Sequence, residues 1–223
     1  MSSNIDLVIF GARGDLARRK LLPALFQLHK AGLLADSVRI AAVAREALDT
    51  AGFIADTLKL LKGENVDNDF DEKAWQGFSR RLTYIKIDFA QKKEFLALKD
   101  WIVEKRTLIY YLATPPSLFG SISRHLHDAN CVDATSRIVL EKPIGHDLKS
   151  SGQVNGAVGE YFSERNIYRI DHYLGKETVQ NLLALRFANR MINSQWDNSC
   201  IDHVQITVAE TVGIEGRWSY YRS

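Results

Sequence analysis

The segment RIDHYLGKE, residues 169–177, places acidic, imidazole, phenol and ammonium groups within nine positions. It begins at the end of IYRI, residues 167–170, which is typical of a short strand. A surface turn requires only one or two polar residues, so a turn alone leaves most of these groups unexplained. Ligands of parallel sheets bind beyond the carboxyl ends of the strands, so we expect a ligand site here. The alternative is that Asp171 and His172 only cap the helix that begins near Lys176.

A second candidate site is FGARGDLARRK, residues 10–20, which connects a strand-like segment to a helix-like one. Glycines in such a turn let backbone amides approach a diphosphate, and the N-terminus of the helix adds partial positive charge. The spacing GxxGDLA is not the complete dinucleotide fingerprint GxGxxG, and two glycines at such a turn are common in α/β proteins. The residues predicted to contact a dinucleotide are Gly11, Arg13, Gly14, Asp15 and Leu16.

Two residues that follow other predicted strands extend this site. In folds of this type an acid after the second strand binds the ribose 2′-hydroxyl of NAD, whereas an arginine there accommodates the 2′-phosphate of NADP. Arg45 holds this place and no acid is expected to compete with it, which favours NADP; the alternative is a solvated loop arginine. Asp88, at the end of the third predicted strand, is either a cofactor contact or a turn-forming aspartate.

The elements that must position these residues alternate along the chain. The predicted strands are 5–10, 38–44, 82–88, 108–113, 137–142 and 167–170. The predicted helices are 15–32, 49–62, 92–105, 117–130 and 147–163, and 63–72 is predicted to be a solvated loop. Strands that are apolar almost throughout, with helices between them, predict a parallel sheet covered on both faces. The handedness of the crossovers then favours a doubly wound α/β fold of the Rossmann type.

The pattern changes after residue 175. Residues 175–192 predict one long amphipathic helix, and residues 201–211 alternate apolar and polar side chains as a half-exposed antiparallel strand does. A single strand cannot pair its own backbone, so the chain is expected to be a fragment that contains only the start of a second, α+β domain. The predicted boundaries are 1–175 for the dinucleotide-binding domain and 176–223 for the incomplete domain.

Composition narrows the classes of function. The chain is 46% hydrophobic and 25% charged, as globular proteins are, and its net charge of +2 comes from scattered residues, which argues against a nucleic-acid partner. Cys131 and Cys200 are expected to be reduced thiols, and no spacing indicates a metal site. No apolar segment approaches the roughly 20 residues of a membrane span, so a cytoplasmic protein without a membrane partner is expected. His125 is expected on the surface, and His203 within the last strand.

Three motifs resemble the glucose-6-phosphate dehydrogenase family, particularly its bacterial form. They are GARGDLARRK (11–20), EKPIGHD (141–147) and RIDHYLGKETVQNLLALRFANR (169–190), and the likeness runs to VAETVGIEGRW near the end of the chain. RIDHYLGKE is highly specific to that family, whereas EKP also follows a Rossmann strand in the glucose–fructose oxidoreductase and inositol dehydrogenase group. Arg13 departs from the serine of many members, which bears on cofactor preference.

The resemblance implies the first step of the oxidative pentose phosphate pathway, in which glucose 6-phosphate is oxidised at C1 to the lactone and hydride passes to NADP. A sugar phosphate requires cations together with mixed hydrogen-bond donors and acceptors. The roles carried over are a partner of the catalytic base for Asp171, and substrate binding for Lys20, Lys142, His172, Tyr173, Lys176 and Glu210. Lys142 is expected to contact the cofactor as well, and Pro143 is a candidate cis proline.

The family's base histidine belongs to an RDxxQNH segment, which does not occur in these 223 residues. The resemblance therefore implies little turnover by this chain, and it implies a homo-oligomer for a full-length member, whose second domain binds substrate and forms the dimer. Two alternatives stay open. The chain could be a non-catalytic NADP-binding fragment, or it could belong to another sugar or polyol oxidoreductase with a Rossmann domain.

Overall fold

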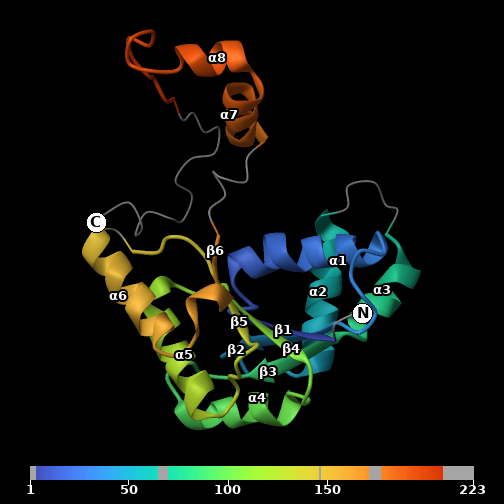
Figure 1. The fold of residues 1–223 in the computed structure, drawn as a ribbon. Coiled ribbons are helices and arrows are strands. Elements are labelled where there is room, and N and C mark those ends of the chain that lie inside the picture. Colours follow the sequence, from blue (N-terminus) through green and yellow to red (C-terminus); the bar gives the residue numbers. More distant parts are fainter. Residues whose placement is uncertain (1–3, 65–69, 146, 171–176, 208–223) are drawn as a thin grey trace. The chain divides into compact units, whose positions relative to one another are not determined.

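The computed structural model describes residues 4–64, 70–145, 147–170 and 177–207 (Figure 1). The chain divides into two compact units, residues 1–171 and 172–223, and each is described by itself. The predicted domain boundary between residues 175 and 176 falls in a segment outside the described residues and stays a prediction.

The first unit contains a six-stranded sheet in which every pair of neighbouring strands is parallel. Its strands are β1 (Ile5–Phe10), β2 (Arg39–Ala44), β3 (Leu82–Lys86), β4 (Thr107–Leu112), β5 (Arg137–Leu140) and β6 (Ile167–Arg169). The order β3-β2-β1-β4-β5-β6 places β1 between β2 and β4, with Val8 opposite both Ala41 and Tyr110. This is the strand order of a doubly wound Rossmann sheet, so the predicted fold class is confirmed.

Helices cover both faces of this sheet (Figure 1). One face packs against α1 (Leu22–Lys30), α2 (Thr50–Glu64) and α3 (Glu72–Ser79), and the other against α4 (Leu96–Trp101), α5 (Phe119–Asp128) and α6 (Leu148–Gly159). Successive residues of β1 contribute to different cores, because Val8 and Phe10 pack on the α5 side and Ile9 on the α1 side. Both faces of the central strands are buried, which explains why these strands read as continuous apolar runs.

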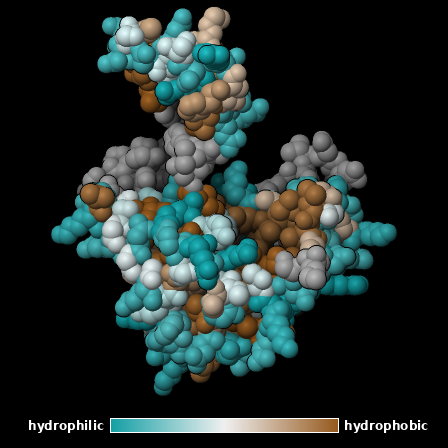
Figure 2. Space-filling model, viewed as in Figure 1, coloured by the Kyte–Doolittle hydropathy of each residue, from teal (hydrophilic) through white to brown (hydrophobic). Residues whose placement is uncertain are grey.

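The predicted helix 15–32 is interrupted by a π-helical turn over Ala17–Leu21. Pro23, in the first turn of α1, has no N–H to donate to the carbonyl four residues earlier, and Leu22 N–H bonds the Ala17 carbonyl five residues earlier instead. The extra residue changes which side chains face the core. Leu22 is buried, but Leu28 is 41% exposed, and apolar surface lies in the region of α1 (Figure 2).

The predicted loop 63–72 is wrong at both ends. α2 extends to Glu64, and α3 begins at Glu72 after Asp71, whose side chain accepts a hydrogen bond from Ala74 N–H at 2.8 Å. Trp75 and Phe78, three residues apart, are buried, and their rings lie 6.2 and 5.6 Å from that of Phe26 on α1. The sequence did not predict α3, because eight residues are too few to show a clear helical period of apolar side chains next to an acidic segment.

The predicted helix 92–105 is shorter in the structure. A 3-10 turn over Lys92–Phe95 leads into α4, which ends at Trp101. The Arg39 guanidinium donates to the Trp101 carbonyl at 3.1 Å and stacks on its ring at 4.3 Å, so a tertiary contact holds the end of the helix. Similarly, β3 ends at Lys86, and the predicted strand residue Asp88 lies beyond it.

A buried ion cluster closes the amino edge of the sheet. Asp6, at the start of β1, is fully buried and accepts hydrogen bonds from Arg39 at 2.9 and 2.5 Å and from Arg106 at 2.5 Å. Arg106 also donates to the carbonyl of Ile5 at 2.9 Å. The cluster therefore connects β1, β2 and the residue before β4 at the edge opposite to the one where Gly11 follows β1.

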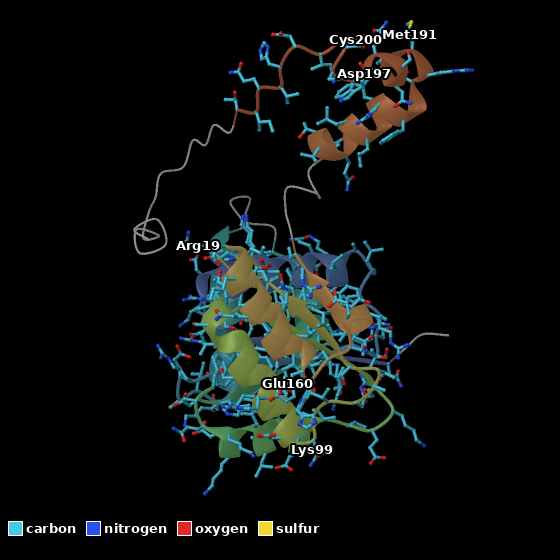
Figure 3. All side chains as sticks on the ribbon, turned by 60° about the vertical axis from the view of Figure 1, so that its left-hand side comes forward. Arg19, Lys99, Glu160, Met191, Asp197 and Cys200 are labelled. Atoms are coloured by element: carbon cyan, nitrogen blue, oxygen red, sulfur yellow. The ribbon has the colours of Figure 1, made fainter. Side chains whose placement is uncertain are left out.

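The second unit contains α7 (Glu177–Ala188) and α8 (Arg190–Gln195) rather than the single predicted helix, because Asn189 leaves the helical conformation at φ −116° and ψ 100°. The predicted strand 201–211 is wrong for residues 201–207, which form no regular structure, and 208–211 lie outside the described part. His203 is therefore not a strand residue, and its Nδ1 lies 2.9 Å from the Asp202 carboxylate. Figure 3 marks Met191 and Cys200 of this unit, both of which are exposed.

Burial separates the two thiols. Cys131 is buried in the first unit, where desolvation raises the pKa of its thiol to about 11. Neither cysteine forms a disulfide bond.

Of the helices that the structure describes, none has both the length and the apolar character needed to cross a membrane.

Candidate functional site

A groove of about 270 Å³ lies at the carboxyl edge of the sheet. Its walls come from the segments after four strands: Gly11, Arg13 and Gly14 after β1, Ala44–Glu46 at the end of β2, Phe89 after β3, and Ala113–Pro115 after β4. The strand order reverses between β1 and β4, which is the point where doubly wound sheets bind their ligands. The predicted glycine loop and the predicted Arg45 thus meet in one cavity.

Gly11 lets the loop after β1 pass between the ends of two neighbouring strands. Its φ is +80°, and a Cβ atom at this position would stand 2.5 Å from the Ala113 carbonyl oxygen. The N–H groups of Gly11 and Ala12 both donate to the Val43 carbonyl, at 2.9 and 3.1 Å. These bonds tie the turn to β2, so the amide of Gly11 itself is not available to a ligand, contrary to the simplest interpretation of the motif.

Other amides of the loop remain available for an anion. Gly14 N–H donates to the Gly11 carbonyl at 2.8 Å, but the N–H groups of Arg13 and Asp15 have no acceptor among the described residues. Asp15 and Leu16 begin the helix, whose first N–H groups have no acceptor within the helix and carry partial positive charge. The loop therefore offers a small set of unpaired donors beside the groove.

Two arginines and one acid line the groove. Arg13 donates to the Asp56 carboxylate of α2 at 2.5 Å, and this hydrogen bond lowers the pKa of Asp56, against an opposing effect of desolvation. Arg45 is exposed and forms no ion pair within the described part of the chain. Glu46 also lines the groove, and its carbonyl accepts from the Tyr84 hydroxyl at 2.8 Å. The expectation that no acid stands beside Arg45 is therefore wrong.

His125 contacts the backbone of Phe89, which forms one wall of the groove. The prediction that His125 lies on the surface is wrong, since it is 7% exposed and its Nδ1 lies 3.2 Å from the Phe89 carbonyl oxygen. The ring of Phe10 meets that of Phe89 edge-on at 5.6 Å. Asp88 is not among the groove residues, and its carboxylate accepts from Ala90 N–H at 3.0 Å, which is a turn-forming contact.

The EKP segment follows β5 at the same edge of the sheet. The bond between Lys142 and Pro143 is cis, as predicted. The hydroxyl of Tyr111 on β4 donates to the Glu141 carboxylate, and burial, followed by this contact, raises the pKa of the Tyr111 phenol. The contact joins the end of β4 to the segment that carries Lys142.

Two predicted substrate lysines lie outside the groove. Lys142 and Lys20 are both exposed, and neither lines the cavity. Lys20 belongs to the π-helical turn, and its neighbour Arg19 stands at one end of the first unit, whereas Lys99 and Glu160 stand at the other (Figure 3). Five other predicted residues lie outside the described residues, and their roles stay predictions: Asp171, His172, Tyr173, Lys176 and Glu210.

Thr114, like Glu46, is a polar groove residue that sequence reasoning missed. It follows β4, is 9% exposed, and its Oγ1 has no hydrogen-bond partner among the described residues. Its place after the strand next to β1 is the signal that could have found it, because the switch point lies there. The chemistry of the groove suits a dinucleotide, since the unpaired amides of the loop can donate hydrogen bonds to diphosphate oxygens.

Comparison with known proteins identifies the family to which the chain is similar. The family model described as glucose-6-phosphate dehydrogenase, NAD binding domain, matches residues 8–181, and that of the C-terminal domain matches residues 183–223. The glucose-6-phosphate 1-dehydrogenases of Dickeya dadantii and Gluconobacter oxydans are 50% and 44% identical to this chain, each over 97% of it. The chain spans 44% and 45% of the length of these two curated relatives.

Solved structures agree with this assignment. The crystal structure of glucose-6-phosphate 1-dehydrogenase from Mycobacterium avium matches with a TM-score of 0.84 and 34% identity, over 98% of this chain and 47% of that one. A glucose-6-phosphate dehydrogenase in complex with its substrate glucose-6-phosphate matches with a TM-score of 0.77 and 33% identity, over 88% and 42% of the two chains. With the strand order and the glycine turn, these matches show that the chain belongs to the glucose-6-phosphate dehydrogenase family.

Proposed function

We propose that this chain carries the cofactor site, and part of the substrate site, of an enzyme that oxidises glucose 6-phosphate at C1 to 6-phosphogluconolactone with NADP. The observation that supports it best is the groove at the switch point, formed by the glycine turn, Arg13 and Arg45 in a chain of this family. The bound nicotinamide would accept the hydride from C1. In the complete protein we propose a homo-oligomer in the cytoplasm.

The chain's own groups would hold the cofactor at two points, the diphosphate and the 2′-phosphate. The free amides of Arg13 and Asp15 and the positive end of the helix favour the diphosphate. The guanidinium of Arg45, with no ion pair among the described residues, favours a 2′-phosphate. Glu46 opposes that charge and Arg13 is already paired with Asp56, so the preference for NADP rests on Arg45 outweighing one exposed carboxylate.

The proposed substrate residues follow neighbouring strands. Leu140 of β5 pairs with Arg169 of β6, so the EKP segment follows a strand that neighbours the one at which RIDHYLGKE begins. Lys142 would contact both cofactor and sugar, and Lys20 would approach from the first helix. The remaining proposed roles are phosphate binding by His172, Tyr173 and Lys176, contact with the sugar hydroxyls by Glu210, and pairing of Asp171 with the base.

Arg45→Ala tests the choice of cofactor. Loss of a charge-assisted hydrogen bond to the 2′-phosphate should weaken NADP binding about tenfold and leave NAD binding within about twofold. Titration calorimetry with both dinucleotides measures this. Arg80→Ala, which removes an exposed cation outside the groove, is the matched control and should change neither constant. Equal losses for NADP and NAD in Arg45→Ala would contradict the assignment of Arg45 to the 2′-phosphate.

The second candidate function is a non-catalytic NADP-binding chain, favoured by the absence of RDxxQNH from the 223 residues. Loss of a general base costs about 10²–10⁴-fold in rate. We therefore expect the 223-residue chain to bind NADP but to turn over glucose 6-phosphate at least about a hundredfold more slowly than a complete enzyme. An NADPH absorbance assay measures this, and a rate near that of a complete enzyme would show that the base lies within this chain. Oxidation of inositol or unphosphorylated glucose, but not of glucose 6-phosphate, would favour another sugar oxidoreductase.

A further inference from the structure

Thr114 is a buried hydrogen-bonding group that the folded chain leaves unpaired. The structure records four such buried side-chain atoms among its described residues, and of these only Thr114 Oγ1 belongs to a residue that lines the groove. An unpaired buried hydroxyl costs free energy in the folded protein, because it has lost water without gaining a partner. Thr114 Oγ1 has almost no accessible surface, so a ligand in the groove becomes its partner if the side chain turns about its Cα–Cβ bond and brings the hydroxyl to the groove.

The surroundings of Thr114 indicate which part of a ligand it would meet. Its Cγ2 lies 3.1 Å from the position that a Cβ of Gly11 would take, so its side chain packs directly beside the glycine turn. The preceding residue, Ala113, is bonded to the end of β1 through its N–H and the Phe10 carbonyl at 3.0 Å. Thr114 therefore stands at the switch point itself, next to the loop with the free amides, and Arg45 approaches the groove from the end of β2, on the other side of β1.

Because Thr114 lies across β1 from Arg45, we propose that its side chain turns when a dinucleotide binds and that Oγ1 then donates a hydrogen bond to the second phosphate or to the ribose attached to it, a portion that NADP and NAD share. This inference rests on the proposed cofactor site and adds a residue to it. Thr114 then contributes affinity without selecting between the two cofactors, and Arg45 contributes the selection.

The test compares variants that differ only in the hydroxyl. Thr114→Val keeps the shape and removes the unpaired group, so the ligand-free chain should melt about 2 °C higher. The same variant should bind NADP and NAD each about tenfold more weakly, which corresponds to about 1.4 kcal/mol. ADP-ribose should lose affinity to the same extent, whereas adenosine 2′,5′-bisphosphate, which lacks the second phosphate and ribose, should bind as before.

A second pair of variants keeps the test valid if the valine variant fails to fold. Thr114→Ser retains the hydroxyl and Thr114→Ala removes it, and both lose the methyl group, so serine should bind NADP about tenfold more tightly than alanine. Equal affinities in both pairs would overturn the proposal, even if the valine variant is more stable. If the parent chain binds neither NADP nor NAD, the proposed cofactor site itself fails, which is a different result from a parent that binds and variants that bind equally well.

Discussion

Gly11→Ala is expected to destabilise the first unit by about 3 kcal/mol and to weaken NADP binding about a hundredfold. The φ of +80° disfavours any L side chain by about 1–2 kcal/mol, and the new Cβ would stand 2.5 Å from the Ala113 carbonyl, an overlap that costs about 1–3 kcal/mol more. The turn would have to leave either Val43 or Ala113. The loop amides would then move away from Thr114, and small displacements of binding groups are costly.

Gly32→Ala is the matched control for this variant. Gly32 has a φ of +69°, but nothing lies within 4 Å of its added Cβ, and it follows α1 far from the groove in sequence. Gly32→Ala should lower the free energy of unfolding by only about 1 kcal/mol, the cost of a positive φ, and should leave NADP affinity unchanged. Urea unfolding and calorimetry measure both quantities. Equal destabilisation by the two variants would show that the contact with Ala113 contributes nothing.

Asp6→Ala should cost about 3–5 kcal/mol of folding free energy, because it leaves two arginines without their buried partner. Asp6 is fully buried and accepts from both Arg39 and Arg106, so the variant removes the anion of the whole cluster. The cofactor affinity of the fraction that folds should be unchanged, since the cluster lies at the amino edge of the sheet and the groove at the carboxyl edge. Urea unfolding and NADP titration of the same preparation measure both effects.

Asp36→Ala is the control that shows how much of the effect of Asp6→Ala comes from burial rather than from the ion pair alone. Asp36 contacts Arg81 at 2.8 Å, a distance similar to those of Asp6, but its side chain is fully exposed. Surface pairs of this kind contribute less than about 1 kcal/mol. If Asp6→Ala costs no more than Asp36→Ala, the buried cluster does not stabilise the amino edge as its geometry indicates.

Segments with a strong local signal were predicted correctly. The strands around Val8, Ala41 and Tyr110 are buried on both faces, and an apolar run of that kind has few alternatives. The glycine loop and Arg45 were placed in one site because parallel strands bring their carboxyl ends to one edge. The cis bond before Pro143 followed from the family motif. Each of these inferences depends on neighbours in sequence or on the strand order alone.

Features that depend on contacts between distant residues were not predictable. Asp56 pairs with Arg13 across 43 positions, and His125 supports Phe89 across 36, and no local pattern records either contact. The strand predicted at 201–211 failed over residues 201–207 because alternation describes a strand only when a neighbouring strand pairs with it.

The amino-acid sequence by itself determined the family, the parallel α/β architecture and the strand ends at which the proposed dinucleotide site lies. Only the tertiary structure decided which donors of that site are free. In the folded chain the amides of Gly11 and Ala12 donate to the Val43 carbonyl, whereas those of Arg13 and Asp15 have no acceptor among the described residues. The hydroxyl of Thr114 is buried without a hydrogen-bond partner among them. The physical reason is that residue type sets how many hydrogen bonds a group can form, whereas the packing of distant segments sets how many of them are already made.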